Sequence, residues 1–179
     1  MRKPMTHELA YRLAQADDAA DLGDFMARNF LSAYGHCSTP ENIQAAISEH
    51  YGEAAQLRQI HDAARWNLIA LSGDDWAGHA QLKSGGAAPA GVTALPAVEL
   101  SRFYVDVKYH GQGIVQAMMQ QVKARARELG ARSIFLSVWQ EQPQAIRFYS
   151  KEGFSIAGTL VFVVGDDPKD DWLMVHSLA

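Results

Sequence analysis

The chain has 179 residues, of which 48% are hydrophobic and 20% are charged, and its formal net charge is -4 at pH 7. This length favours one domain, with a core large enough to need neither disulfides nor a metal. The negative charge argues against a nucleic-acid-binding domain, which is normally basic. It is mildly favourable for a protein that binds a cationic substrate.

The single cysteine, Cys37, excludes an internal disulfide and fits a reducing compartment. The N-terminal segment has no apolar run of signal-peptide length, and no stretch approaches the ~18 apolar residues of a membrane span. The histidines are scattered without HxxxH or HExxH spacing, so no metal site is expected. These features predict a cytoplasmic protein without a membrane or nucleic-acid partner.

Hydrophobic periodicity, capping residues and turn residues predict an alternation of strands and helices along the chain. Asp17 is expected to cap the first helix, and Thr39-Pro40-Glu41 is a start signal for the second. The expected strands are 8–13, 66–71, 76–83, 98–107, 133–139, 158–164 and 172–177; the expected helices follow Asp17 and Thr39 and cover 53–64, 114–129 and 143–153. A strand-helix-strand crossover in this order predicts an α/β (α+β) fold with a mixed sheet.

Two glycines, Gly111 and Gly113, separate the strongest strand candidate from the strongest helix candidate. The first amides of a helix lack intrahelical partners and carry partial positive charge, and glycines allow a ligand to approach them closely. A phosphate group is the natural ligand for such a site. Neither GxGxxG nor GxxxxGK[ST] is present, so local features support a tight structural turn and a phosphate site equally.

The segment from Glu99 to Val115, ELSRFYVDVKYHGQGIV, resembles the central motif of the GNAT superfamily of N-acetyltransferases. In that superfamily a strand leads into a turn of the form Gln/Arg-x-x-Gly-x-Gly/Ala, whose amides hold the pyrophosphate of acetyl-coenzyme A. Residues 136–154 resemble the superfamily's second motif, which ends in A-I-x-F-Y-x-K-x-G-F. His110, Val115 and Gln142 depart from the usual residues, which are Gln or Arg, Gly or Ala, and Asn.

The resemblance extends over roughly residues 10–176 and implies one N-acetyltransferase domain spanning residues 1–179, with six to seven strands flanked by helices. It implies acetyl-coenzyme A as cosubstrate. The residues that it assigns to cofactor binding are Phe103, Tyr104, Val105, His110, Gly111, Gln112, Gly113, Ile114, Val115, Gln142 and Ala145.

The same resemblance implies how the chemistry is divided among residues. Tyr149 falls on the position of the catalytic tyrosine, where a phenol can donate a proton to the leaving thiolate. A backbone N–H near Val105 would polarise the thioester carbonyl. Glu99 is the candidate base, acting directly or through water; the alternative is a solvated or salt-bridged glutamate, with Arg102 as its partner.

The acceptor is less defined than the cosubstrate. The N-terminal segment NFLSAYGHCSTPENIQAAISEHY and the C-terminal strands resemble the branch that includes polyamine N-acetyltransferases, which implies a small primary amine. The aspartates at 166, 167, 170 and 171 can attract a polyamine, although a charged, solvated turn is the favoured interpretation. Acetylation of a protein N-terminus or lysine, and a non-catalytic coenzyme A-binding module, are the alternatives. Dimers are common in the superfamily, so a homodimer is one assembly to test.

Overall fold

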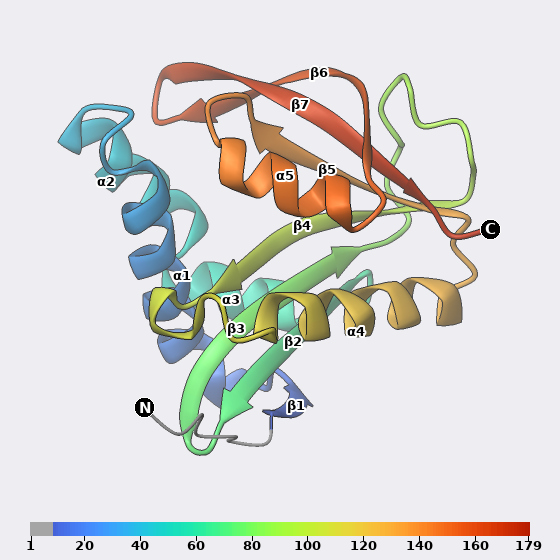
Figure 1. Cartoon of the computed structure of the whole chain (residues 1–179). Coiled ribbons are helices and arrows are strands. Elements are labelled where there is room, and N and C mark those ends of the chain that lie inside the picture. The colour runs from blue at the N-terminus through green and yellow to red at the C-terminus, as the bar shows by residue number, and fades with distance from the viewer. Residues whose placement is uncertain (1–8) are drawn as a thin grey trace, which may run out of the picture.

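A computed structural model describes residues 9–179 and contains a seven-stranded mixed sheet with helices on both faces (Figure 1). The strand order is β1-β2-β3-β4-β5-β7-β6. Neighbouring strands are antiparallel except β4 and β5, which are parallel and joined through α4. The predicted mixed sheet of six to seven strands is therefore confirmed.

The bounds of the elements differ from the expected ranges by a few residues. The strands are β1 (Leu9–Leu13), β2 (Arg65–Ser72), β3 (Asp75–Lys83), β4 (Ala97–Val105), β5 (Ser133–Trp139), β6 (Ser155–Val164) and β7 (Asp167–Ser177). The helices are η1 (Ala16–Asp18), α1 (Ala19–Tyr34), α2 (Pro40–His50), α3 (Glu53–His61), η2 (Val107–Tyr109), α4 (Ile114–Glu128) and α5 (Pro143–Lys151).

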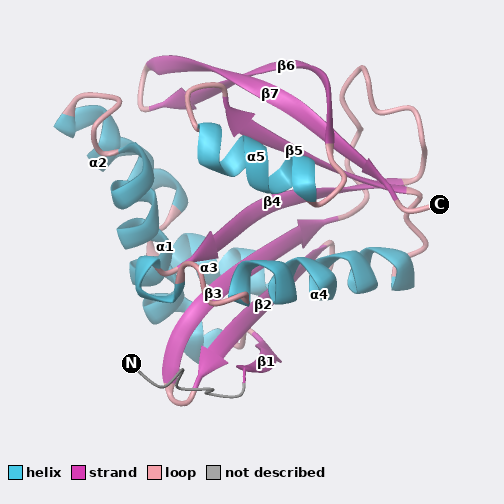
Figure 2. Ribbon diagram, viewed as in Figure 1, coloured by secondary structure: helices cyan, strands magenta, loops and turns pink. Residues whose placement is uncertain are grey.

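Helices α4 and α5 lie on one face of the sheet and α1, α2 and α3 on the other (Figure 2), and each face carries its own apolar cluster. The first contains the buried face of α4, including Met118, Met119 and Val122, and the apolar residues of α5 pack against it. The second contains the buried face of α1, including Phe25 and Phe30, together with residues of α2 and β6. The helices that carry the two sequence motifs, α4 and α5, therefore share one face.

The parallel strands β4 and β5 diverge along their length (Figure 1). Their pairing runs only from Ala97 opposite Ser133 to Glu99 opposite Phe135. Beside this point β4 has a bulge at Ser101, because Leu82 of β3 pairs with Leu100 and the preceding β3 residue, Gln81, pairs with Arg102. Beyond Glu99, β4 is paired to β3 alone within the described chain, which leaves its other edge available to a different partner.

The predicted start of α1 and the predicted end of β4 are wrong, because side chains near these positions find other partners. Asp17 does not cap α1; Asp18 instead forms an ion pair with Arg12, with 2.6 Å between Oδ2 and Nη1, and α1 begins at Ala19. β4 ends at Val105 because the Asp106 carboxylate accepts a hydrogen bond from the Lys108 amide and starts η2. The expected first residue of β1, Glu8, lies outside the described residues.

The C-terminal hairpin is longer than the sequence indicates. β6 begins at Ser155 and β7 at Asp167, rather than at residues 158 and 172, because the two strands pair along their full length around a bulge between Ile156 and Gly158. The expected charged turn is thus shortened to the link around Gly165 and Asp166. Asp171, which was assigned to that turn, is a strand residue with 4% exposure.

Candidate active site

The turn before α4 presents a row of free main-chain amides. Gly111 and Gly113 have φ angles of 75° and 80°, and Gly113 is the N-terminal cap of the helix. Within the described chain, the N–H groups of residues 111–116 donate no hydrogen bond, and the first amide to do so is that of Ala117, to the Gly113 carbonyl at 3.0 Å. Six successive free donors at a helix N-terminus form a binding site for an anion such as a phosphate.

The space in front of these amides is open. An added Cβ atom at Gly111 or Gly113 would meet no atom within 4 Å. The two glycines are therefore required by their left-handed backbone and not by crowding. Residues present at the turn fit a pyrophosphate, because the donors are main-chain groups and no side chain covers the glycines.

The side chains of the turn support its shape. The His110 Nε2 donates to the Val105 carbonyl at 2.9 Å, and the side-chain amide of Gln112 (Nε2) donates to the Lys108 carbonyl at 2.9 Å. Ile114 is buried and Val115 is half-buried at the start of the helix. The predicted residues 110–115 therefore come together at one place, with the polar side chains bonded to the preceding backbone.

Tyr149 lies in an aromatic group that joins α5 to the end of β4. Its ring centroid is 6.4 Å from that of Phe103 and 5.7 Å from that of Phe154, and Phe103 stacks on Phe148 at 5.9 Å. Burial raises the pKa of the Tyr149 phenol. The hydroxyl therefore remains protonated at neutral pH, as a proton donor must be. Ala145, one helical turn earlier, packs against the same apolar cluster.

A buried ion pair holds α4 and α5 together. The Lys123 Nζ lies 2.9 Å from the Glu152 carboxylate and donates to the Glu152 carbonyl at 2.8 Å. Lys123 is 8% exposed. Because Lys123 is in the helix that starts at the free amides, and Glu152 follows the helix of Tyr149, the pair fixes the two motifs relative to each other.

Phe103 and Tyr104 are directed to opposite faces of the sheet. Phe103 packs with α5, whereas the Tyr104 hydroxyl lies 3.1 Å from the Tyr51 hydroxyl among the residues of α1 and α2. The Arg102 guanidinium lies 5.4 Å from the centroid of the Tyr51 ring. Burial, followed by the neighbouring Tyr51, raises the pKa of Tyr104. Tyr104 and Arg102 thus belong to the face opposite Tyr149's helix.

The structure adds Asp171 to this face, with partners that the sequence did not indicate. Its Oδ2 accepts a hydrogen bond from the Ser137 hydroxyl, and its Oδ1 is buried without a hydrogen-bond partner among the described residues. The pKa of Tyr34 is raised by burial first and then by Asp171, Tyr149 and Tyr51. Tyr34 therefore lies within electrostatic reach of both Asp171 and Tyr149.

Glu99 and Gln142 occupy positions different from the other predicted residues. Glu99 is half-buried at the last pair that joins β4 to β5, and its neighbours Val98 and Leu100 face α4, so Glu99 faces the other side. The ion pairs formed within residues 9–179 do not include Glu99 with Arg102. The Gln142 side-chain amide donates to the Ala33 carbonyl at 3.0 Å, which ties the start of α5 to α1.

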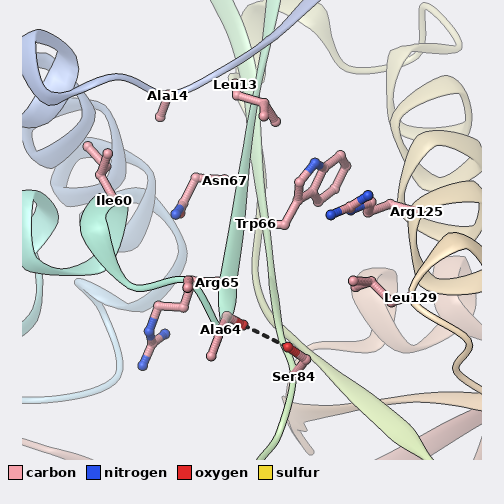
Figure 3. Close-up of a pocket in the computed structure, with 11 residues that line it drawn as sticks. Leu13, Ala14, Ile60, Ala64, Arg65, Trp66, Asn67, Ser84, Arg125 and Leu129 are labelled. Atoms are coloured by element: carbon pink, nitrogen blue, oxygen red, sulfur yellow. Dashed lines mark hydrogen bonds between the residues drawn. The ribbon is translucent and has the colours of Figure 1, made fainter.

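A cavity of about 180 Å³ lies at the β1 edge of the sheet, far from these residues. Figure 3 shows that Ile60 and Asn67 lie on one side of β2, while Trp66, Arg125 and Leu129 lie on the other. At a rise of about 1.5 Å per residue, Arg125 is roughly 18 Å along α4 from Gly113. The hollow is divided by a strand and does not belong to the candidate site.

The model of the acetyltransferase (GNAT) family matches residues 27–154, which include both motifs. The chain belongs to this family. An uncharacterized N-acetyltransferase of Mycobacterium tuberculosis is 34% identical over 161 residues, covering 90% of this chain and 98% of that protein. The chain is therefore an enzyme of the N-acetyltransferase class.

Other relatives are more distant or shorter in their match. A spermine/spermidine N(1)-acetyltransferase of Bacillus subtilis is 35% identical over 66 residues, covering 36% of this chain and 43% of that protein. The crystal structure of a PaiA N-acetyltransferase from Thermoplasma acidophilum, in complex with coenzyme A, has a TM-score of 0.79 at 20% identity and covers 95% of this chain and 99% of that one. This chain therefore has the same fold as that crystal structure.

None of the helices within residues 9–179 is both long and apolar enough to span a bilayer. Nor do three or more His, Cys, Asp or Glu side chains gather within that range in an arrangement that would hold a metal ion.

Proposed function

We propose that this GNAT-family enzyme transfers an acetyl group from acetyl-coenzyme A to a primary amine of a small molecule. The observation that carries the proposal is the row of six free amides at residues 111–116, on the same face of the sheet as Tyr149. Acetyl-coenzyme A supplies a thioester and a pyrophosphate in one molecule. The amides suit the pyrophosphate, and the divergence of β4 and β5 leaves a strand edge to which the pantetheine arm can bond.

The relatives support the proposed cosubstrate and acceptor. The solved Thermoplasma acidophilum protein holds coenzyme A on the same fold. The Bacillus subtilis relative is named for spermine and spermidine, so a polyamine is one member of the acceptor class that we propose for this chain. We propose that the cosubstrate lies among Phe103, Val105, His110, Gln142 and Ala145, near the turn and α5, whereas the Tyr104 side chain faces α1 and α2.

The residues present can perform the three proton transfers of the reaction. An alkylammonium with a pKa near ~10.4 must lose a proton before its nitrogen can attack. We assign this proton to Glu99, directly or through water. The neutral amine then forms the new N–C bond as the C–S bond breaks. The Tyr149 hydroxyl donates its proton to the departing thiolate and recovers one from the new amide nitrogen.

The thioester carbonyl needs hydrogen-bond donors while negative charge develops on its oxygen. β4 has no strand partner on its β5 side after Glu99 within the described chain. Its main-chain N–H groups near Val105 are therefore suited to this role. No side chain has to be assigned to it.

A thiol-release assay with acetyl-coenzyme A tests the proposal. The acceptor panel contains spermidine, short alkylamines, amino acids, aminoglycosides and peptides with a free N-terminus or lysine. We expect release with at least one small primary amine. Release with peptides alone would assign the enzyme to protein acetylation. Measurable binding of coenzyme A without release for any acceptor would overturn the proposal in favour of a non-catalytic binding module.

A further inference from the structure

We propose that Asp171 binds the ammonium group of the acceptor through its Oδ1 oxygen. This inference rests on the proposed function and identifies the acceptor as a compact primary alkylammonium. Asp171 lies in β7, beyond both motifs of the family, and its position follows from the pairing of β7 with β5.

The first argument is the state of the carboxylate. Asp171 is 4% exposed, yet only Oδ2 has a hydrogen-bond donor, the Ser137 hydroxyl. The ion pairs formed within the described chain do not include Asp171. A buried carboxylate oxygen without a donor is costly, so such a group is expected to have a partner that the chain does not itself provide.

The second argument is the location. Tyr34 is close enough to both Asp171 and Tyr149 for each to raise the pKa of its phenol. Its ring centroid lies 6.0 Å from that of Trp139, the residue paired with Asp171 across the β5–β7 ladder. The free oxygen therefore lies beside aromatic rings, on the face of the sheet towards which Glu99, the proposed base, also points.

The third argument concerns the kind of cation. A guanidinium prefers a carboxylate with both oxygens available, because it donates two parallel hydrogen bonds. Ser137 already uses Oδ2, which leaves one oxygen for a compact ammonium. Lys169, the nearby chain ammonium, is bonded to the Cys37 carbonyl and paired with Asp167, so it does not fill the position. Aromatic rings also favour a bound ammonium.

The neighbours of Asp171 provide a matched control. Asp170 is the preceding residue and is exposed, so the two aspartates differ in burial but not in side-chain chemistry. Asp171→Asn retains shape and removes the charge. Asp170→Asn removes the same charge at the surface. Because the Asn variant can misfold, Ser137→Ala/Asp171→Ala provides a second test in which both hydrogen-bonding partners are removed together.

The experiment measures steady-state kinetics, coenzyme A affinity by calorimetry and the melting temperature of each variant. We expect Asp171→Asn to raise the KM for the best amine by about 10-fold or more. We also expect the affinity for coenzyme A and the KM for acetyl-coenzyme A to stay within about 2-fold, and Asp170→Asn to match the wild type. The double variant should show the same loss for the amine.

Other results overturn the inference. An unchanged KM for the amine in a folded Asp171 variant would do so, as would an equal loss of coenzyme A affinity, which would indicate a structural role. An absence of turnover with every amine in the wild type contradicts the proposed function instead. In that case the binding of n-butylamine to the coenzyme A-loaded protein decides: equal binding, or equal lack of binding, by wild type and Asp171→Asn overturns the inference.

Discussion

The two halves of the candidate site are built in different ways. The half proposed to bind the cosubstrate is made of main-chain amides at one turn, where residues 111–116 follow one another in the chain. The half proposed to bind the acceptor is made of side chains from separate elements: Tyr34 from α1, Ser137 from β5 and Asp171 from β7. Main-chain recognition tolerates substitution of the side chains around it, whereas side-chain recognition depends on each residue.

The largest effect is expected at Tyr149 of α5. Tyr149→Phe removes the proposed proton donor and keeps the ring that packs on Phe103 and Phe154. We expect kcat to fall by about 100-fold or more, with the KM for acetyl-coenzyme A nearly unchanged. Steady-state kinetics measure both. Tyr109→Phe, beside the turn, is the control, and an unchanged kcat in Tyr149→Phe would remove this residue from the mechanism.

The link between the two motif-bearing helices is tested by the buried ion pair. Lys123→Met leaves the Glu152 carboxylate buried without its partner, and we expect the free energy of unfolding to fall by about 3 kcal/mol. Chemical denaturation measures this value. The double variant Lys123→Met/Glu152→Gln should recover part of the loss. A loss below about 1 kcal/mol, the range of surface pairs, would contradict the role of the pair.

The stability of the protein should depend on pH in the acid range, because His79 is a titratable group buried in β3. Burial and the neighbouring Arg102 lower the pKa of His79 to about 3, from the ordinary 6.5. As the pH falls below 6.5, His79 becomes protonated in the unfolded state but stays neutral in the folded state. The free energy of unfolding therefore does not depend on His79 above this pH, and it decreases as the pH falls from 6.5 towards 3.

The measurement is the free energy of unfolding between pH 7 and pH 4 for the wild type and for His79→Gln. The His79 contribution has a limiting slope of about 1.4 kcal/mol per pH unit. We expect the free energy of unfolding to fall more steeply with decreasing pH in the wild type than in His79→Gln. Parallel curves for wild type and His79→Gln would contradict a buried neutral imidazole.

The main-chain half is tested at Gly113. Gly113→Ala places a Cβ on a left-handed residue, which costs roughly 1–2 kcal/mol. Since the added atom meets nothing within 4 Å, the strain is in the backbone alone. We expect lower stability together with weaker binding of coenzyme A, measured by calorimetry, because relief of the strain would turn the amides away. Unaltered affinity in a folded Gly113→Ala variant would show that these amides do not bind the cosubstrate.

The smallest effects are expected for the side chains of the same turn. Gln112→Ala should leave the affinity for coenzyme A within about 2-fold of the wild type, since this side chain bonds the Lys108 carbonyl. Val115→Ala retains the amide and removes the β-branched group, and we expect binding to be equal or slightly tighter. A large loss of affinity for coenzyme A in either variant would contradict recognition by the main chain. It would indicate that side chains bind the ligand in both halves of the site.

Local patterns were sufficient for much of the structure. The strand before the glycines, α4 after them and Pro143 at the start of α5 were predicted because their signals act over a few residues. The last hairpin was placed incorrectly, because the pairing of β6 with β7 overrides the turn residues at 165–168. Burial of Asp171 is a consequence of that pairing and has no local signal.

The amino-acid sequence by itself determined the alternation of elements, the glycine turn and the aromatic motif that contains Tyr149. These depend on backbone freedom, helix periodicity and neighbouring residues. Only the tertiary structure decided which side chains form the proposed acceptor half. Tyr34, Ser137 and Asp171 are separated by more than thirty residues at each step. They come together because β5 diverges from β4 and pairs with β7, and burial then leaves one oxygen of Asp171 without a donor.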